Sequence, residues 1–187
     1  MTHPILAISG PPGSGKSTLI GALVARFRVH VVHFDAHEQM TDRSLAEMED
    51  WIARGMPLAE MLPPGLTAHL RAAAADAPVL FETPLGRAVA DHSALIGWSV
   101  WLDLPADIAL ARKIAATVGQ ADWASQQELS AWLQGYLAAY PQIVAPSLAM
   151  QAARVRPLAD EILDAGLDPE RLADQLSLRL QGWQRSV

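Results

Sequence analysis

The chain has 187 residues, no cysteine and only two lysines, Lys16 and Lys113. Without cysteine it forms no disulfide, thiolate nucleophile or cysteine metal site. A net charge of −6 leaves no basic stripe along a nucleic-acid backbone, so we expect no nucleic-acid binding. No apolar run approaches the ~20 residues of a membrane span, and the first residues lack the features of a signal peptide. We therefore expect a cytoplasmic protein without a membrane partner.

Hydrophobic residues make up 51% of the chain, which is enough for a substantial core. Short apolar or β-branched runs, typical of buried parallel strands, alternate with segments that have helical spacing. The expected strands are 5–9, 29–34, 79–81, 99–104 and 161–163, and the expected helices are 17–26, 44–54, 66–75, one after Pro105, 126–140 and 168–180. This alternation predicts one α/β domain over residues 1–187, with three layers and a parallel sheet of about five strands flanked by helices.

Two local signals set helix ends in this prediction. Ser44 and Glu47 have the spacing of a capping box, so a helix should begin there. Pro141 should end the helix 126–140, because proline lacks the backbone N–H that a helix interior needs. Residues 56–65 contain three prolines and are expected to form a loop.

The most specific feature is a complete G-x-x-x-x-G-K-[ST] pattern between the first expected strand and the first expected helix. Its glycines allow a ring of inward backbone N–H groups, and the helix N-terminus adds its positive dipole end. Lys16 would bind the β- and γ-phosphates, and the Ser17 hydroxyl would be a ligand for Mg²⁺. The sequence therefore predicts an ATP-binding P-loop formed by Gly10, Pro11, Pro12, Gly13, Ser14, Gly15, Lys16, Ser17 and Thr18.

Two classes of P-loop protein are disfavoured. A regulatory GTPase needs an Asn/Thr-Lys-x-Asp segment, and the only lysine beyond the loop is followed by Ile114 and Ala115. A motor or transporter ATPase would be larger or part of a multidomain machine, although Glu82 or Asp103 could supply its strand-end acid.

Beyond the loop, the chain resembles the small P-loop kinases of the nucleoside and nucleoside-monophosphate kinase group, especially the uridine-kinase-like branch. Asp35 ends the second strand, where that group places the acid that binds or deprotonates the acceptor hydroxyl. Arg112 matches the group's arginine that reaches the transferring phosphoryl group, although Lys113 stands where many members have a second arginine. The resemblance implies catalytic roles for Lys16, Asp35 and Arg112.

Other candidate residues are open to two interpretations. Glu82 ends the third strand and would hold the acceptor or a water on Mg²⁺, or simply cap a turn. Arg87 follows Gly86 and would bind a substrate or phosphoryl oxygen, or lie solvated on the surface. His30 and His33 alternate on one strand, and with no evident third ligand we do not expect them to bind a metal.

These observations predict an ATP- and Mg²⁺-dependent kinase that phosphorylates a hydroxyl of a small metabolite, with a nucleoside as the leading acceptor by resemblance. The acceptor would bind near a helical segment at about 36–75, and a lid-like segment at about 113–127 would close over it. A nucleoside-monophosphate, sugar-nucleotide or small-acid kinase, or a non-catalytic ATP-dependent switch, remain alternatives. The sequence leaves the acceptor and the oligomeric state open, a homodimer included.

Overall fold

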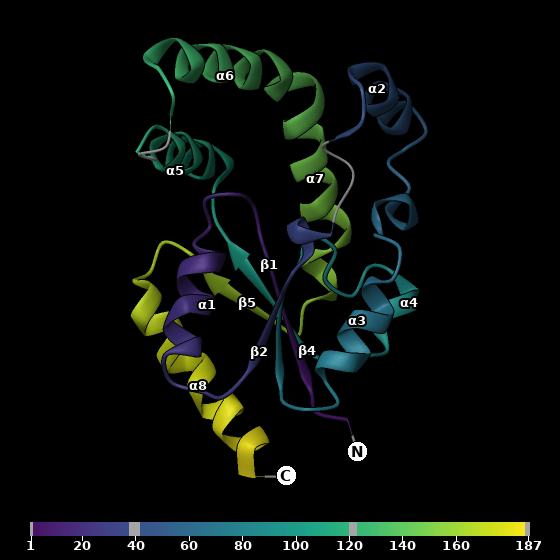
Figure 1. The fold of residues 1–187 in the computed structure, drawn as a ribbon, viewed down its shortest axis with the longest axis vertical. Helices are drawn as coiled ribbons and strands as arrows, with labels where there is room; N and C mark the ends of the chain where they lie inside the picture. Colours follow the sequence, from purple (N-terminus) through teal and green to yellow (C-terminus); the bar gives the residue numbers. More distant parts are fainter. Residues whose placement is uncertain (1, 38–41, 120–122, 186–187) are drawn as a thin grey trace.

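Figure 1 shows the computed structural model of the chain, which describes residues 2–37, 42–119 and 123–185. Five strands form one sheet, and their order across it is β2-β3-β1-β4-β5. All four neighbouring pairs are parallel. The strands are β1 (Ile5–Ser9), β2 (His30–His33), β3 (Val79–Glu82), β4 (Ile96–Asp103) and β5 (Glu161–Asp164). The predicted parallel sheet of about five strands is confirmed.

The helices connect these strands and cover both faces of the sheet. They are α1 (Lys16–Val24), α2 (Leu45–Ala53), α3 (Leu66–Ala73), α4 (Ala90–Ser93), α5 (Ala106–Val118), α6 (Gln126–Ala139), α7 (Ala145–Arg154) and α8 (Pro169–Arg185). Shorter helical turns are η1 (Phe34–Ala36), η3 (Leu58–Met61), η4 (Tyr140–Val144) and η5 (Arg156–Leu158). No helix in the described part of the chain is both long and apolar enough to cross a membrane.

The central strand β1 is buried on both faces, which explains its apolar sequence. Leu6 and Ile8 pack in one core cluster with residues of α1 and α8, whereas Ile5 and Ala7 pack in a second cluster with residues of α3. Because successive side chains point to opposite faces, a strand between two helical layers needs apolar residues at consecutive positions. The three layers predicted from the sequence are thus formed by helices on each side of this strand (Figure 1).

A second group of helices lies beyond the carboxyl ends of the strands rather than on the sheet faces. Figure 1 shows α2, α5 and α6 at that end, with α7 running from α6 back toward the sheet. Carboxyl ends of parallel strands are where α/β proteins place their ligands. These helices therefore enclose the edge of the sheet that carries the phosphate loop.

The α-helix α6 ends at Ala139, within one residue of the end predicted before Pro141, but the backbone stays helical beyond it. The chain passes from α6 through the π-helical turn η4, which contains Pro141, directly into α7. Because proline has no backbone N–H, Pro141 cannot continue the α-helical hydrogen bonds of α6, and the chain forms a π-helical turn there. The result is a bend that turns α7 toward the sheet (Figure 1).

Other boundaries agree closely with the prediction. Ser44 caps α2 in a reciprocal capping box with Glu47, as the spacing predicts. Strand β4 begins three residues earlier than expected, at Ile96. Helices α4 and α7 were not predicted. Residues 38–41 of the predicted acceptor segment and 120–122 of the predicted lid lie outside the described residues.

Candidate active site

The loop between β1 and α1 adopts the conformation that its glycines allow. Gly10, Gly13 and Gly15 all have positive φ angles, of 147°, 81° and 86°. At two of these positions there is also no room for a side chain. A Cβ at Gly10 would lie 2.6 Å from the Leu102 carbonyl oxygen, and a Cβ at Gly13 would lie 2.5 Å from the Ala109 carbonyl oxygen. A side chain would therefore displace the loop from β4 and α5, and the unpaired N–H groups at the start of α1 would lose their position.

Lys16 lies inside the loop. Its Nζ donates to the carbonyl oxygens of Gly10 at 3.0 Å and Pro11 at 3.1 Å. Burial lowers the pKa of Lys16, and the negative charges of Glu82 and Asp35 oppose that shift. The half-buried ammonium group thus lies close to two carboxylates and beside the phosphate-binding N–H groups, where a phosphate would be a favourable counter-charge.

Ser17, Glu82 and His33 form a chain of polar contacts next to Lys16. The Ser17 hydroxyl donates to Glu82 Oε1 at 3.2 Å, and His33 Nδ1 lies 2.6 Å from Glu82 Oε2. The parallel register of β2 and β3 pairs His33 with Glu82, so the contact follows from the sheet itself. Sequence analysis did not assign His33 a role, because only the strand order places it beside Glu82.

This donor set fits a magnesium ion. Mg²⁺ prefers oxygen ligands and keeps several waters, and the Ser17 hydroxyl and Glu82 carboxylate supply oxygen atoms beside the loop. Bound there, the ion would neutralise charge on the β- and γ-phosphates. An ionised Glu82 can only accept hydrogen bonds, so His33 must donate from Nδ1, and that bond fixes the orientation of the carboxylate.

This geometry predicts that His33→Ala will raise the Mg²⁺ concentration needed for ATP to stabilise the protein, by about tenfold. A hydrogen bond to a charged group contributes about 1.5–3 kcal/mol, and its loss would free Glu82 to rotate. His33→Asn keeps a donor near the position of Nδ1 and should recover part of the effect. The measurement is the ATP-dependent shift in Tm during a Mg²⁺ titration.

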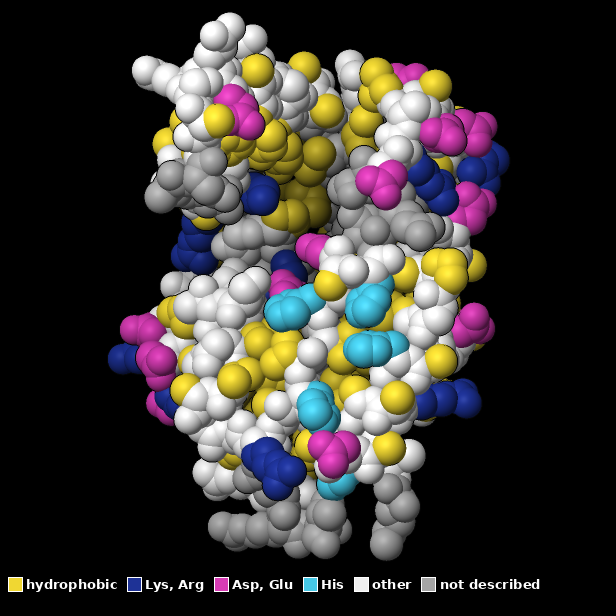
Figure 2. Space-filling model, in the orientation of Figure 1, with side chains coloured by type: hydrophobic (Ala, Val, Ile, Leu, Met, Phe, Trp, Pro, Cys, Tyr) yellow, Lys and Arg dark blue, Asp and Glu magenta, His cyan; other side chains and the backbone are white. Residues whose placement is uncertain are grey.

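His30→Ala is the matched control for this prediction. His30 lies on the same strand and is likewise paired with a carboxylate, Asp76 at 2.9 Å, but Asp76 lines neither cavity, whereas Glu82 lines both. Figure 2 shows histidines gathered on this face of the molecule. If His33→Ala, His30→Ala and the wild type all need the same Mg²⁺ concentration for ATP to raise the Tm, His33 does not position Glu82.

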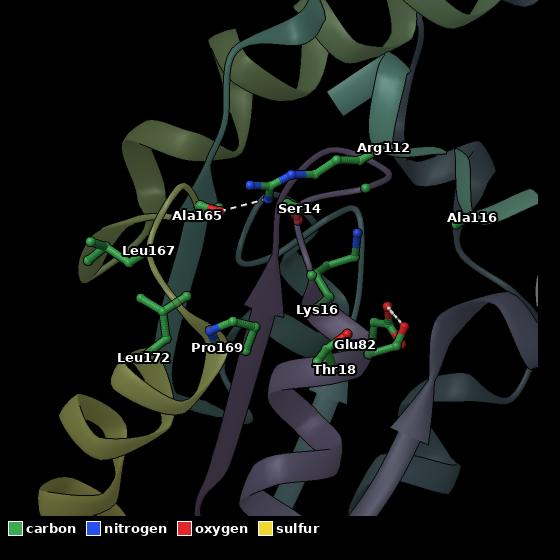
Figure 3. A pocket seen from close by; sticks show the side chains of 13 residues that line it. Ser14, Lys16, Thr18, Glu82, Arg112, Ala116, Ala165, Leu167, Pro169 and Leu172 are labelled. Carbon is green, nitrogen blue, oxygen red and sulfur yellow. Dashed lines mark hydrogen bonds between the residues drawn. The ribbon is translucent and has the colours of Figure 1, made fainter. Parts of the chain in front are cut away.

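Two cavities meet at the phosphate loop. The first, of about 480 Å³, lies between the loop and the segment that connects β5 to α8. Beyond the loop it is lined mainly by apolar side chains, as Figure 3 shows: Ala116, Ala165, Leu167, Pro169 and Leu172. This combination of a phosphate cradle and an adjoining apolar wall suits a nucleotide base.

The second cavity, of about 370 Å³, lies on the other side of Lys16 and Ser17. Its wall comes from the ends of β2 and β3 and from the bent helices: Asp35, Thr83, Pro84, Lys113, Tyr136, Val144 and Gln151. Figure 2 shows a hollow at the upper end of the molecule, between its left and right parts, with hydrophobic side chains inside. Gly13, Lys16, Ser17 and Glu82 line both cavities, so the two spaces share the loop as a common wall.

Asp35 lies where the sequence predicted, in the turn η1 directly after β2. It lines the second cavity and is close enough to Lys16 to raise the pKa of its ammonium group. Glu82 lies between the two cavities. These two acids are therefore placed together with Lys16, although β2 and β1 are not neighbours in the sheet.

Arg112 and Lys113 are adjacent in α5 but serve different cavities. Arg112 lines the first cavity, and its Nη1 donates to the Ala165 carbonyl oxygen at 2.9 Å (Figure 3). Lys113 lines the second cavity and lies near enough to Lys16 to lower its pKa. Successive helical residues diverge by about 100°, so this division follows from helix geometry. The sequence suggested a site role for Arg112 and little for Lys113.

Arg87 is not in either cavity. Its guanidinium donates to the carbonyl oxygens of Ile96 and Ser93 and pairs with Asp160 at 2.8 Å. Asp160 also accepts from the Ser99 backbone N–H at 2.7 Å, so Arg87 connects α4, β4 and the start of β5. The structure does not place Arg87 with the other predicted substrate residues, and we leave it out of the proposed site.

Sequence analysis missed the residues that the bent helices bring to the second cavity. Tyr136 comes from α6 and Gln151 from α7, and both follow the predicted acid residues by more than fifty positions. Their only sequence signal was a polar residue and an aromatic residue on helical segments, which is ordinary for surface helices. The bend at Pro141 decides where they lie.

Comparison with known proteins gives a family model, "ATPase family associated with various cellular activities (AAA)", that matches residues 6–65, a segment containing the phosphate loop. No curated protein matches the chain by sequence. A sugar kinase from Janibacter sp. HTCC2649 is similar in structure, with a TM-score of 0.54 and 20% identity over 96% of this chain and 95% of that one.

Two further solved structures are similar over most of their length. A shikimate kinase from Aquifex aeolicus has a TM-score of 0.49 and 15% identity, covering 95% of this chain and 96% of that chain. A gluconokinase from Sinorhizobium meliloti has a TM-score of 0.49 and 17% identity, covering 95% and 98%. With its loop, strand order and the likeness to the sugar kinase, the chain has the P-loop NTPase fold.

Proposed function

We propose that this chain is an ATP-dependent kinase that transfers the γ-phosphoryl group to a hydroxyl of a small metabolite. The observation that carries the proposal is the pair of cavities that share Gly13, Lys16, Ser17 and Glu82. A transferase must hold donor and acceptor on opposite sides of the moving group, whereas a nucleotide switch needs only one site. The kinases among the similar structures agree with this reading but do not carry it.

Different residues would bind the nucleotide, bind the acceptor and stabilise the transferring group. The loop N–H groups and Lys16 bind the phosphates, while the apolar first cavity receives the base. The acceptor hydroxyl enters the second cavity beside Asp35, and its oxygen forms the new bond to the γ-phosphorus as the bond from that phosphorus to the bridging oxygen of ADP breaks. Asp35 orients the hydroxyl and takes its proton. Lys113 faces the same space and stabilises the charge on the transferring group.

Arg112 and Lys113, adjacent in α5, allow a paired test of the assignment of the first cavity to the nucleotide base and the second to the acceptor. Arg112→Ala should weaken ATP binding by about tenfold and leave kcat nearly unchanged, because Arg112 lines the base cavity. Lys113→Ala should lower kcat by about tenfold or more and leave ATP affinity nearly unchanged, since removal of a charge that contacts the transition state acts on kcat. ATP titrations by Tm shift, followed by kinetics with an acceptor, give both values. A loss of kcat in Arg112→Ala with normal ATP affinity would instead support the transition-state role that the family resemblance implies.

The proposal is tested by a screen for ADP formation with nucleosides, nucleoside monophosphates, sugars and small acids. A kinase releases ADP faster when its acceptor is present, and Lys16→Ala supplies the blank for contaminating activities. ADP release that no acceptor class accelerates would favour the alternative of an ATP-dependent switch.

A further inference from the structure

We propose that the acceptor of this kinase is an uncharged, hydroxyl-rich ring compound, such as a nucleoside or a neutral sugar, and not a phosphate ester or a carboxylic acid. The inference rests on the proposed function, because it concerns the second cavity as the acceptor site. It is carried by the charges that line this cavity and by its one aromatic wall.

Among the described residues, the lining of the second cavity has no positive charge in excess of its negative charge that could bind an anionic acceptor. Its lining includes two acids, Asp35 and Glu82, and two lysines, Lys16 and Lys113, and no arginine among the described residues. Residues 38–41 and 120–122, whose positions are not described, contain no lysine or arginine. Apart from Lys16 and Lys113, the lysine and arginine side chains of the described structure therefore lie outside the lining of this cavity.

The arginines that come nearest in sequence to the cavity residues are held by other groups. Arg112 donates to the Ala165 carbonyl oxygen in the base cavity, and Arg87 pairs with Asp160. Arg154, three residues after Gln151, donates to the carbonyl oxygens of Gly55 and Met56 at 2.9 and 3.0 Å. Recruiting any of them for an acceptor would break these bonds and leave their partners unsatisfied.

Both lysines of the cavity already have a role in the proposed reaction, Lys16 with the β- and γ-phosphates and Lys113 with the transferring phosphoryl group. Lys16 lies inside the phosphate loop, and Lys113 is close enough to it to depress its pKa. The charges of the two acids and two lysines sum to zero, and bound MgATP, in which the ion offsets only part of the phosphate charge, then makes the space negative. A carboxylate or phosphate on the acceptor would enter a site without a counter-charge, whereas a neutral hydroxyl compound would meet no such penalty.

The uncharged part of the second cavity's wall is suited to binding a ring compound. Tyr136 lines the cavity and is stacked on Trp132, with ring centroids 5.1 Å apart and an interplanar angle of 11°. Stacking holds the tyrosine ring in place, and Val144 and Pro84 extend the apolar surface. Gln151, which is only 8% exposed, adds a polar side chain to this wall. A buried amide in a cavity is a specific donor and acceptor for hydroxyl or base atoms.

The test uses pairs of probes that differ by one charged group: uridine against uridine 5′-monophosphate, and glucose against gluconate. Binding is measured by calorimetry to the wild-type protein with Mg²⁺ and a non-hydrolysable ATP analogue. We expect a neutral probe to bind and its charged partner to bind at least about tenfold more weakly, the effect of one uncompensated charge several ångströms away. Tighter binding of the charged partner, or no binding of either neutral probe to protein that binds the ATP analogue, would overturn the inference.

Two variants test the ring contact. Tyr136→Leu keeps apolar volume but removes the ring, and it should weaken binding of the neutral probe by about tenfold. Tyr140→Leu makes the same change four residues later, where the side chain does not line the cavity, and should change binding less than threefold. Equal effects of the two variants would contradict stacking on Tyr136.

The outcomes separate this inference from the proposed function. A neutral probe that binds selectively but is never phosphorylated would leave the inference about the cavity intact and refute the kinase. Phosphorylation of uridine 5′-monophosphate or gluconate in preference to its neutral partner would support the kinase and refute the inference.

Discussion

Lys16→Ala is expected to remove almost all stabilisation of the protein by ATP and Mg²⁺. In the wild type, a ligand at a hundred times its Kd raises the free energy of unfolding by about 2.7 kcal/mol. Lys16 is the cation held inside the loop by the carbonyl oxygens of Gly10 and Pro11, so its loss removes the principal counter-charge for the β- and γ-phosphates. The affinity should fall by about a hundredfold, and the Tm shift should disappear at the same nucleotide concentration.

Two comparisons make this result interpretable. The variant without nucleotide should stay folded by circular dichroism, because Lys16 is only half-buried and belongs to neither core cluster. Lys113→Ala removes the other lysine of the chain and should keep the ATP-induced shift. If ATP raises the Tm of Lys16→Ala as much as it raises the Tm of the wild type, the nucleotide does not bind at this loop.

Asp35→Asn is expected to slow phosphoryl transfer by about a hundredfold or more while ATP binding changes little. The substitution keeps the size of the side chain and part of its hydrogen bonding, but it removes the charge that accepts the proton of the hydroxyl. A general base contributes about 10²–10⁴-fold. Asp35 lies in the second cavity and outside the base cavity, so the nucleotide should be almost unaffected.

The control for Asp35→Asn is Asp76→Asn, which removes an exposed acid paired with His30 and distant from both cavities. Kinetics with an acceptor from the screen and ATP titration of the same proteins give the two quantities. Activity within a fewfold of the wild type would make Asp35 structural and Glu82 the next acid to test. A collapse of ATP binding would instead place Asp35 among the groups that hold Mg²⁺.

Local signals in the sequence were sufficient to predict the fold and the phosphate-binding part of the site. Each strand is a short apolar run with a helix after it, and the phosphate loop has a complete motif between β1 and α1. The acids after β2 and β3 could be expected near the loop, because carboxyl ends of parallel strands meet at one edge. Their placement beside Lys16 needed no knowledge of the strand order.

The rest of the site, including most of the acceptor cavity, depends on long-range geometry that the sequence does not display. The contact between His33 and Glu82 exists because β2 lies next to β3 in the sheet. The division between Arg112 and Lys113 depends on how α5 packs over the loop, where the Gly13 position lies close to both residues. Gln151 lies at the cavity because the backbone stays helical through η4 and bends into α7, whereas the proline alone predicted only that α6 would end.

The most direct test follows the phosphoryl group itself. The wild-type protein is incubated with ATP labelled with ¹⁸O in its γ-phosphoryl group and with the best acceptor from the screen, and the products are identified by mass spectrometry. We predict that the label will appear on a hydroxyl of the acceptor, with one labelled acceptor formed for each ADP. Label found only in inorganic phosphate, in amounts equal to the ADP, would contradict a kinase and show that the protein hydrolyses ATP.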